Sequence, residues 1–199
     1  STASQIEVLR GPATLFYGSG AIGGVINVVD NRIPQRVPVQ RETVLQTRYG
    51  TAAGDRSLSF AHDSGQGNLA WHADGSYRNG NDYQVPRYQN DEGDSSRRLQ
   101  NSWSEHQVLN LGSSYVAEQG FVGVSIGKLK TEYGLPEGPS SEPAAGEYIK
   151  LNQQRLALAS EYRPQQSNWQ NLNFDLAYTD YDHAEFEDDE AGTEFLSKA

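Results

Sequence analysis

The sequence predicts an all-β protein, specifically an antiparallel transmembrane β-barrel portion of about seven strands. Two observations favour this fold class. Apolar and polar residues alternate with a period of two from Arg41 onward, and the connections between the alternating segments are long and short in turn. A third observation excludes helical membrane proteins, because the longest nearly apolar stretch, residues 20–29, is far shorter than the roughly 20 residues of a membrane-spanning helix.

Seven segments carry the alternation, and each predicts a strand with one apolar and one polar face. In the third segment, Leu69, Trp71 and Tyr77 alternate with the more polar His72 and Asp74. The other six segments lie near residues 41–50, 57–61, 109–115, 122–126, 156–162 and 172–178.

The lengths of the connections distinguish the two ends of the predicted sheet. Short turns rich in Gly, Pro, Ser and Asn follow the second, fourth and sixth strands, at residues 64–68, 118–120 and 163–168. We expect external loops near residues 79–104, 131–147 and 182–199. Long loops at one end and short turns at the other are typical of outer-membrane barrels. A soluble all-β binding domain is the alternative, since its strands alternate in the same way.

Composition narrows the class of protein further. The net charge is -10, so nucleic acid is not an expected partner. There are no cysteines, which excludes disulfides and thiolate metal sites. No nucleophile and base constellation is present, and we therefore expect a protein that is not an enzyme.

The opening segment, IEVLRGPATLFYGSGAIGGVINVVD at residues 6–30, is rich in glycine. It resembles the end of the plug domain in TonB-dependent outer-membrane receptors. The plug motif residues that we single out are Arg10, Gly11, Pro12, Tyr17, Gly18, Gly23, Gly24 and Asn27, and Glu7, Ala21, Val25 and Ile26 also match. Glycine suits a crowded plug because it lets backbone approach backbone. The resemblance implies that Arg10 pairs with acidic residues of the barrel wall. This ion pair is either purely structural or part of the transport mechanism.

The resemblance implies a domain organisation and a location. Residues 1–32 would be the C-terminal end of the plug domain, residues 33–40 a linker, and residues 41–199 the N-terminal strands of a barrel of about 22 strands. We expect a fragment of a receptor in the outer membrane of a Gram-negative bacterium. Its expected partners are outer-membrane lipid and lipopolysaccharide, the cargo, and TonB, which would be contacted through an N-terminal segment absent from the sequence.

An acidic stretch near the end of the chain predicts a metal site. Eight acidic residues and no basic residue lie between Asp180 and Glu194. If the last strand continues with the same parity, His183, Glu185 and Glu187 share its inward face. Imidazole and carboxylate ligands suit zinc, nickel or iron. The alternative is a solvated acidic surface.

The cargo prediction follows from this stretch and from the family. The sequence DYDHAEFE followed by GTEF resembles the corresponding strand of the zinc-uptake subfamily, so a scarce metal ion or metal chelate, with zinc favoured, is the expected cargo. A ferric-siderophore or haem receptor is the alternative within the family. Aromatic and cationic residues in the second external loop suit such a chelate: Tyr83, Tyr88, Arg87, Arg97 and Arg98. No resident cofactor is expected, only a transported zinc or iron.

The remaining histidines are expected to be wall or interface residues. His62 and His72 lie on predicted strands, with His72 on the polar face, and His106 begins the fourth strand. His106 together with Glu105 could join an external site.

Overall fold

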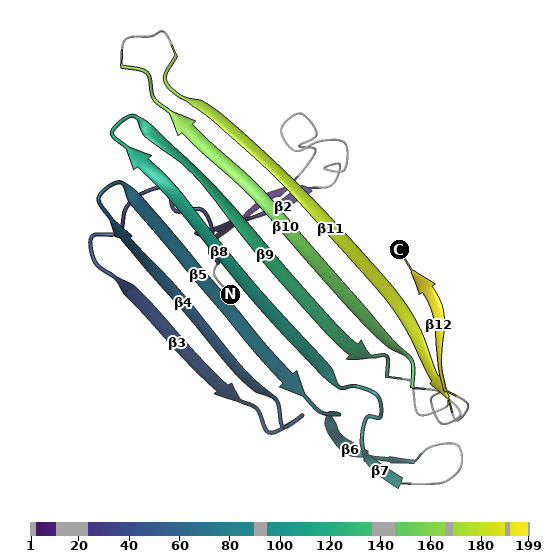
Figure 1. Ribbon diagram of the computed structural model, residues 1–199. Coiled ribbons are helices and arrows are strands. Elements are labelled where there is room, and N and C mark those ends of the chain that lie inside the picture. Colours follow the sequence, from purple (N-terminus) through teal and green to yellow (C-terminus); the bar gives the residue numbers. More distant parts are fainter. Residues whose placement is uncertain are drawn as a thin grey trace.

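The computed structural model describes residues 3–10, 24–89, 95–136, 146–165, 169–189 and 192–198, and these residues form strands and connections without helices (Figure 1). Its main sheet contains β3 (Glu42–Tyr49), β4 (Arg56–Gln66), β5 (Leu69–Gly80), β8 (Ser104–Ala117), β9 (Gly120–Gly134), β10 (Tyr148–Tyr162), β11 (Leu172–Asp189) and β12 (Gly192–Lys198). Within the described residues, no helix is long and apolar enough to cross a membrane.

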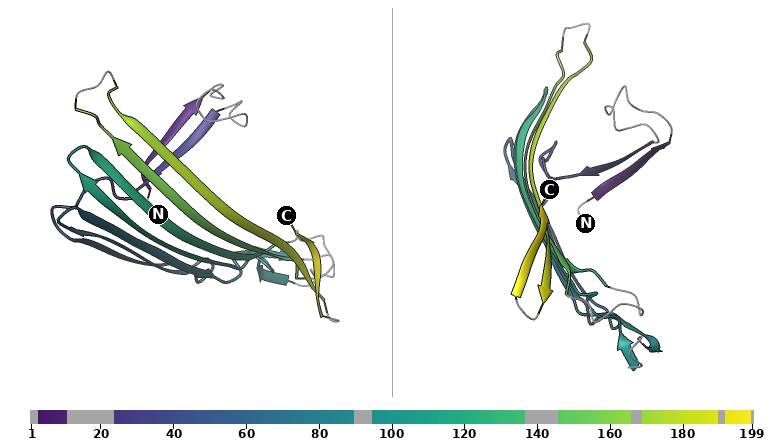
Figure 2. Two further views of the ribbon diagram at one scale, coloured as in Figure 1. Left: turned by 45° about the horizontal axis from the view of Figure 1, so that its top comes forward. Right: turned by 90° about the vertical axis from the view of Figure 1, so that its right-hand side faces the viewer.

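The predicted all-β, antiparallel fold class is confirmed. The eight strands follow the order β12-β11-β10-β9-β8-β5-β4-β3, and every neighbouring pair is antiparallel. The seven strands from β3 to β11 in this sheet correspond to the seven predicted segments. Figure 2 shows that the sheet is strongly curved, like part of a barrel wall. The barrel is not closed, because β3 and β12 are the two edges of the described sheet.

The two longest connections within the main sheet, between β5 and β8 and between β9 and β10, lie at the same end of the sheet (Figure 1). Two-residue turns separate β4 from β5 and β8 from β9, and Gly67 in the first turn has a φ of 59°, a conformation that glycine tolerates best. At the other end, the expected loop over residues 79–104 contains a small hairpin of β6 (Gln84–Gln89) and β7 (Ser95–Arg98).

The loop expected over residues 182–199 is instead a β-hairpin in the described residues. β11 continues through Asp189, and β12 pairs with it. Aromatic pairing explains the extension, because Phe186 lies opposite Tyr148 of β10 and their rings stack with centroids 5.1 Å apart. The high density of acidic residues therefore does not end the strand.

The two faces of the sheet have opposite chemistry. On the convex face, every one of the seven strands presents exposed apolar side chains, represented by Leu45, Phe60, Trp71, Leu111, Val124, Leu156 and Phe174. On the concave face, the buried side chains are mostly polar, including those of His72, Asp74, Asn110, Ser114 and Ser125. This is the reverse of a soluble protein, in which large apolar side chains gather in the interior.

A second, two-stranded sheet precedes the wall. β1 (Ala3–Arg10) and β2 (Gly24–Asp30) pair in an antiparallel hairpin, which lies on the concave side of the main sheet (Figure 2). Residues 31–41 then run along that face and lead into β3. We call residues 31–38 the linker segment, because they connect the hairpin to the wall.

Candidate functional site

A buried ionic network on the concave face is centred on His72 of β5. His72 is 3% exposed. Its Nδ1 atom lies 2.9 Å from Oδ1 of Asp63, and its Nε2 atom lies 2.9 Å from Oδ1 of Asp74. Asp63 is the direct cross-strand partner of His72, and Asp74 is two residues further along the same face. The β-sheet register alone therefore brings these three side chains together.

The geometry defines the charge of the network. Asp74 uses its second oxygen, Oδ2, to accept a hydrogen bond of 2.9 Å from Nδ2 of Asn110. An ionised carboxylate only accepts hydrogen bonds, so both ring nitrogens of His72 must carry a hydrogen atom to satisfy both carboxylates. The arrangement fits an imidazolium held between two carboxylates, because a buried charge requires partners of opposite sign.

The linker segment is hydrogen-bonded to this network. Nδ2 of Asn31 donates to Oδ1 of Asp63 at 2.7 Å, so this oxygen accepts from both Asn31 and His72. The network thereby joins three strands of the wall, β4, β5 and β8, to the segment that follows β2. The hydrogen bond between Asn31 and Asp63 ties the linker segment to the wall.

Close packing against glycines holds the rest of the linker segment. A Cβ atom added to Gly112 would overlap the carbonyl oxygen of Arg32, and one added to Gly123 would lie 2.5 Å from Cγ2 of Ile33. The next residue, Pro34, is fully buried. The wall residues at these positions lack side chains, which allows the backbone of the linker to approach the sheet.

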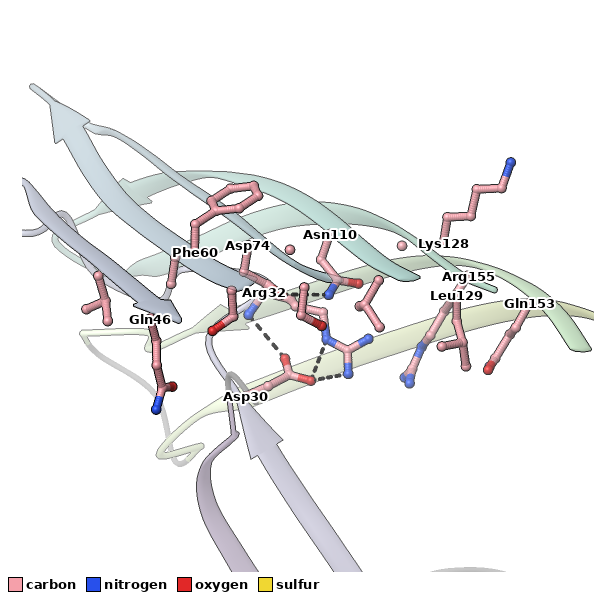
Figure 3. Close-up of a pocket in the computed structure, with 17 residues that line it drawn as sticks. Asp30, Arg32, Gln46, Phe60, Asp74, Asn110, Lys128, Leu129, Gln153 and Arg155 are labelled. Atoms are coloured by element: carbon pink, nitrogen blue, oxygen red, sulfur yellow. Dashed lines mark hydrogen bonds and ion pairs between the residues drawn. The ribbon is translucent and has the colours of Figure 1, made fainter. Parts of the chain in front are cut away.

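Arg32 also contributes a charged group beside the network. It forms an ion pair with Asp30, with Nε donating to Oδ2 at 2.6 Å, and its backbone N–H donates to Oδ1 of the same carboxylate at 3.1 Å. Figure 3 shows this pair on the side of the wall opposite to the Lys128 side chain. Asp30 and Arg32 line a cavity of about 410 Å³. The cavity is also lined by Asp74, Asn110 and Arg155, so it combines charged groups with apolar ones such as Val44 and Leu129.

The predicted plug motif is partly described. Its first and last parts fall on β1 and β2, where Arg10 is opposite Gly24 and Glu7 is opposite Asn27. Gly11, Pro12, Tyr17, Gly18 and Gly23 lie outside the described residues, as does the side chain of Arg10. The pairing of Arg10 with wall acids therefore stays a prediction.

The predicted metal ligands lie on one face of β11. His183 and Glu185 share the inward face, with Nε2 and Oε1 3.8 Å apart, and Glu187 follows at the same parity. Within the described part of the chain, no group of three His, Asp or Glu side chains is arranged to hold a metal ion. The zinc site stays a prediction that requires a further ligand or a rearrangement.

The other histidines lie on different faces of the main sheet. His72 lies on the polar face, as predicted, and His62 lies on the opposite face, hydrogen-bonded to Oγ1 of Thr43 at 2.8 Å. His106 contacts Oγ1 of Thr131 at 3.0 Å on the concave face. The suggested joint site of His106 and Glu105 is not formed, because adjacent residues of a strand point to opposite faces.

The importance of Asp63 and Asp74 was not recognised from the sequence, although a signal exists. The two-residue turn at Gly67 and Asn68 pairs Gln66 with Leu69, and counting back three residues on each side pairs Asp63 with His72. Hairpin counting from the turn would have predicted this contact.

The fold and the site together define a portion of a β-barrel wall with a segment anchored to its concave face. Comparisons with known proteins find similarity over parts of the chain. The chain is 41% identical over 62 residues to the vitamin B12 transporter BtuB of Vibrio vulnificus, covering 31% of this chain and 9% of the relative. It is 47% identical over 59 residues to an iron-regulated outer membrane virulence protein of Vibrio cholerae, covering 28% and 9%. It is 59% identical over 29 residues to a probable TonB-dependent siderophore receptor of Acinetobacter baumannii, covering 15% and 4%.

These similarities are partial. The chain spans less than a tenth of the length of each of these three relatives. No protein-family model matches the chain. Two of the three names describe a transporter or a receptor, and none of the three mentions zinc.

Proposed function

We propose that the chain is the junction between plug and barrel, together with the first barrel strands, of a TonB-dependent receptor in the outer membrane of a Gram-negative bacterium. The opposite chemistry of the two sheet faces carries this proposal. Leu176 and Tyr178 on the convex face are 61% and 68% exposed, whereas His72 on the concave face is 3% exposed. Lipid outside and a polar lumen inside explain both observations.

The soluble alternative has less support. A soluble sandwich covers the apolar face of one sheet with a second sheet at a distance of about 10 Å. No second layer covers the convex face in the described residues, while the small β1–β2 hairpin lies on the other side (Figure 2).

Within this proposal, residues 1–32 are the end of the plug, residues 33–40 the linker of the family and residues 41–199 the barrel wall, so the linker segment of residues 31–38 crosses the boundary between the first two. The external parts lie near residues 79–104, 131–147 and 182–199. The separate β1–β2 sheet and the start of β3 at Glu42 support these boundaries. The resemblance of the opening motif implies that TonB supplies the energy for import and contacts a segment outside this sequence.

The cargo class that we propose is a metal chelate or a cobalamin. The names of the partial relatives include vitamin B12 and siderophore, and this supports our choice of these cargoes over the free zinc ion expected from the sequence. Arg155 lines the cavity beside Arg32 and supports an anionic chelate because its guanidinium can pair with an anion, whereas Arg32 is already paired with Asp30. Free zinc at His183, Glu185 and Glu187 is the second candidate, supported by the short distance between the first two side chains.

An uptake experiment tests this function. The gene that contains this chain is deleted, and the deleted and complemented strains are compared for uptake of labelled ferric siderophores, cobalamin and zinc. We expect the deletion to abolish uptake of one chelate at nanomolar concentration and complementation to restore it. Unchanged uptake of all of these cargoes would contradict the proposal, and loss of zinc uptake alone would favour the second candidate.

A further inference from the structure

A groove crosses the apolar convex face near the long-connection end of the sheet. Its volume is about 420 Å³, and its apolar lining includes Leu58, Phe60, Tyr77 and Leu109. The groove exists because Gly75 has no side chain between Phe60 on β4 and Leu109 on β8, its two cross-strand partners. The ring of Phe60 leans over this position, since a Cβ atom on Gly75 would lie 2.7 Å from its Cε1 atom.

Two lysines border the same groove. Lys128 and Lys130 of β9 both line it, and they share the convex face because they are two residues apart. Figure 3 shows the Lys128 side chain extending away from the side of the sheet on which Gln153 and Arg155 lie. Neither lysine forms an ion pair with any of the described residues, so both ammonium groups are available to a ligand.

The lysines also mark the end of the apolar band. One cross-strand row of the convex face contains Leu111, Ile126, Leu156 and Tyr178, which are all apolar or aromatic. In the next row, Lys128 is followed by Gln154 and Asp180 on β10 and β11. On the other side of Lys128, the row continues with Leu109, Gly75 and Phe60, which form the groove. The apolar part of the convex face therefore ends at Lys128, and polar residues begin there.

This combination suits one chemical class of ligand. An apolar groove on the lipid-facing surface can receive an acyl chain, and two ammonium groups at its polar end can pair with a phosphate. The nearest acidic residues of the same face, Glu105 and Glu132, lie one position further toward the loops. Glu105 accepts a hydrogen bond of 2.7 Å from Gln107.

We propose that Lys128, Lys130 and the groove over Gly75 form a binding site for the phosphorylated, acylated lipid of the outer leaflet, the lipid anchor of lipopolysaccharide. This inference depends on the proposed function only in placing the long-connection end at the outer leaflet. It assigns to the convex face a specific lipid contact that is independent of the cargo and of the anchoring network.

Native mass spectrometry of the complete receptor tests the site. The purified protein is titrated with diphosphorylated lipid A and with the same lipid after enzymatic dephosphorylation. We expect the double variant Lys128→Gln/Lys130→Gln to bind the diphosphorylated lipid roughly 30-fold more weakly, from the attraction of two lysines to an anionic lipid surface. The matched control is Arg163→Gln, which removes an exposed cation at the opposite end of the sheet.

The outcomes separate this site from the proposed function. Weakened lipid binding in the double variant, with the control and chelate uptake unchanged, would support the site. Equal binding of both lipids by the native protein, or unchanged binding by the double variant, would overturn it. A receptor that binds the lipid through these lysines but imports no chelate would contradict only the cargo proposal.

Discussion

Nδ2 of Asn31 donates a hydrogen bond to Oδ1 of Asp63 at 2.7 Å, and this contact joins the linker segment to the barrel wall. The same oxygen accepts from His72, which in turn contacts Asp74. The position of the linker is therefore coupled to a buried charge network rather than to a single contact. A change in any member of the network is expected to affect the wall and the linker together.

Removal of the carboxylate of Asp74 should strongly destabilise the wall. The variant Asp74→Ala leaves the His72 imidazolium with one partner and Asn110 without its acceptor. We expect a loss of about 3 kcal/mol in the free energy of unfolding, as for other broken buried ion pairs. Urea unfolding of the receptor in lipid vesicles measures this value. The control Asp180→Ala, at an exposed position of β11, should change the free energy of unfolding by less than about 0.5 kcal/mol. Similar losses of stability in both variants would contradict the assigned network.

A side chain at Gly112 should displace the linker. In Gly112→Ala, the new methyl group overlaps the carbonyl oxygen of Arg32, and the linker backbone must move away from the sheet. We expect trypsin to cleave faster after Arg36 in this variant than in the native protein. Electrophoresis of samples taken over time measures the cleavage rate. Gly75→Ala is the matched control because it adds the same methyl group to the convex face, where the nearest atom belongs to a ring of Phe60. Equal cleavage rates in the two variants would argue against linker packing at Gly112.

Charge on the convex face should impair membrane insertion. Leu176→Arg places a guanidinium on the surface assigned to lipid, at a cost of about 2–4 kcal/mol if the site is near the bilayer midplane. Thr179→Arg, an exposed residue of the opposite face, should fold into vesicles almost normally. The folding yields of the two variants are compared by heat-dependent electrophoretic mobility. Equal yields would favour a soluble protein.

The predicted zinc site gives a separate test. If zinc binds at β11, His183→Ala and Glu185→Ala should each weaken zinc binding by roughly tenfold or more, since even outer-shell changes have effects of that size. Calorimetry on the complete receptor measures the affinity, with His62→Ala as a control on the other face of the wall. Zinc affinity that is unchanged in both β11 variants would remove the site.

Most of the fold could be predicted from the sequence because it depends on local periodicity. The alternation of Leu172, Phe174 and Leu176 with polar residues correctly assigned the faces of β11, since hydrogen-bonded pairing preserves that parity. Turn residues such as Gly67 correctly located the hairpins. The extension of β11 through the expected loop was less predictable, because Phe186 stacks on Tyr148 of β10, which is distant in sequence.

The site was less predictable because its contacts cross from one element to another. His72 was placed on the polar face, but its two carboxylate partners depend on strand register and its link to Asn31 depends on the path of the linker. The glycines that admit the linker, Gly112 and Gly123, lie within strands, where the sequence gives no sign of an approaching backbone. Alternation assigns a face, whereas the contacts on that face require the tertiary structure.

Crosslinking between the linker and β4 tests the central claim most directly. The chain contains no cysteine, so introduced pairs report only their own proximity. In the complete receptor in outer membranes, cysteines at Asn31 and Asp63 should be joined by a short thiol crosslinker, because these side chains are in contact on the concave face. Cysteines at Asn31 and His62 should remain separate, because His62 points to the lipid-facing side. Efficient crosslinking of Asn31 to His62, or none to Asp63, would contradict a linker anchored inside the barrel wall.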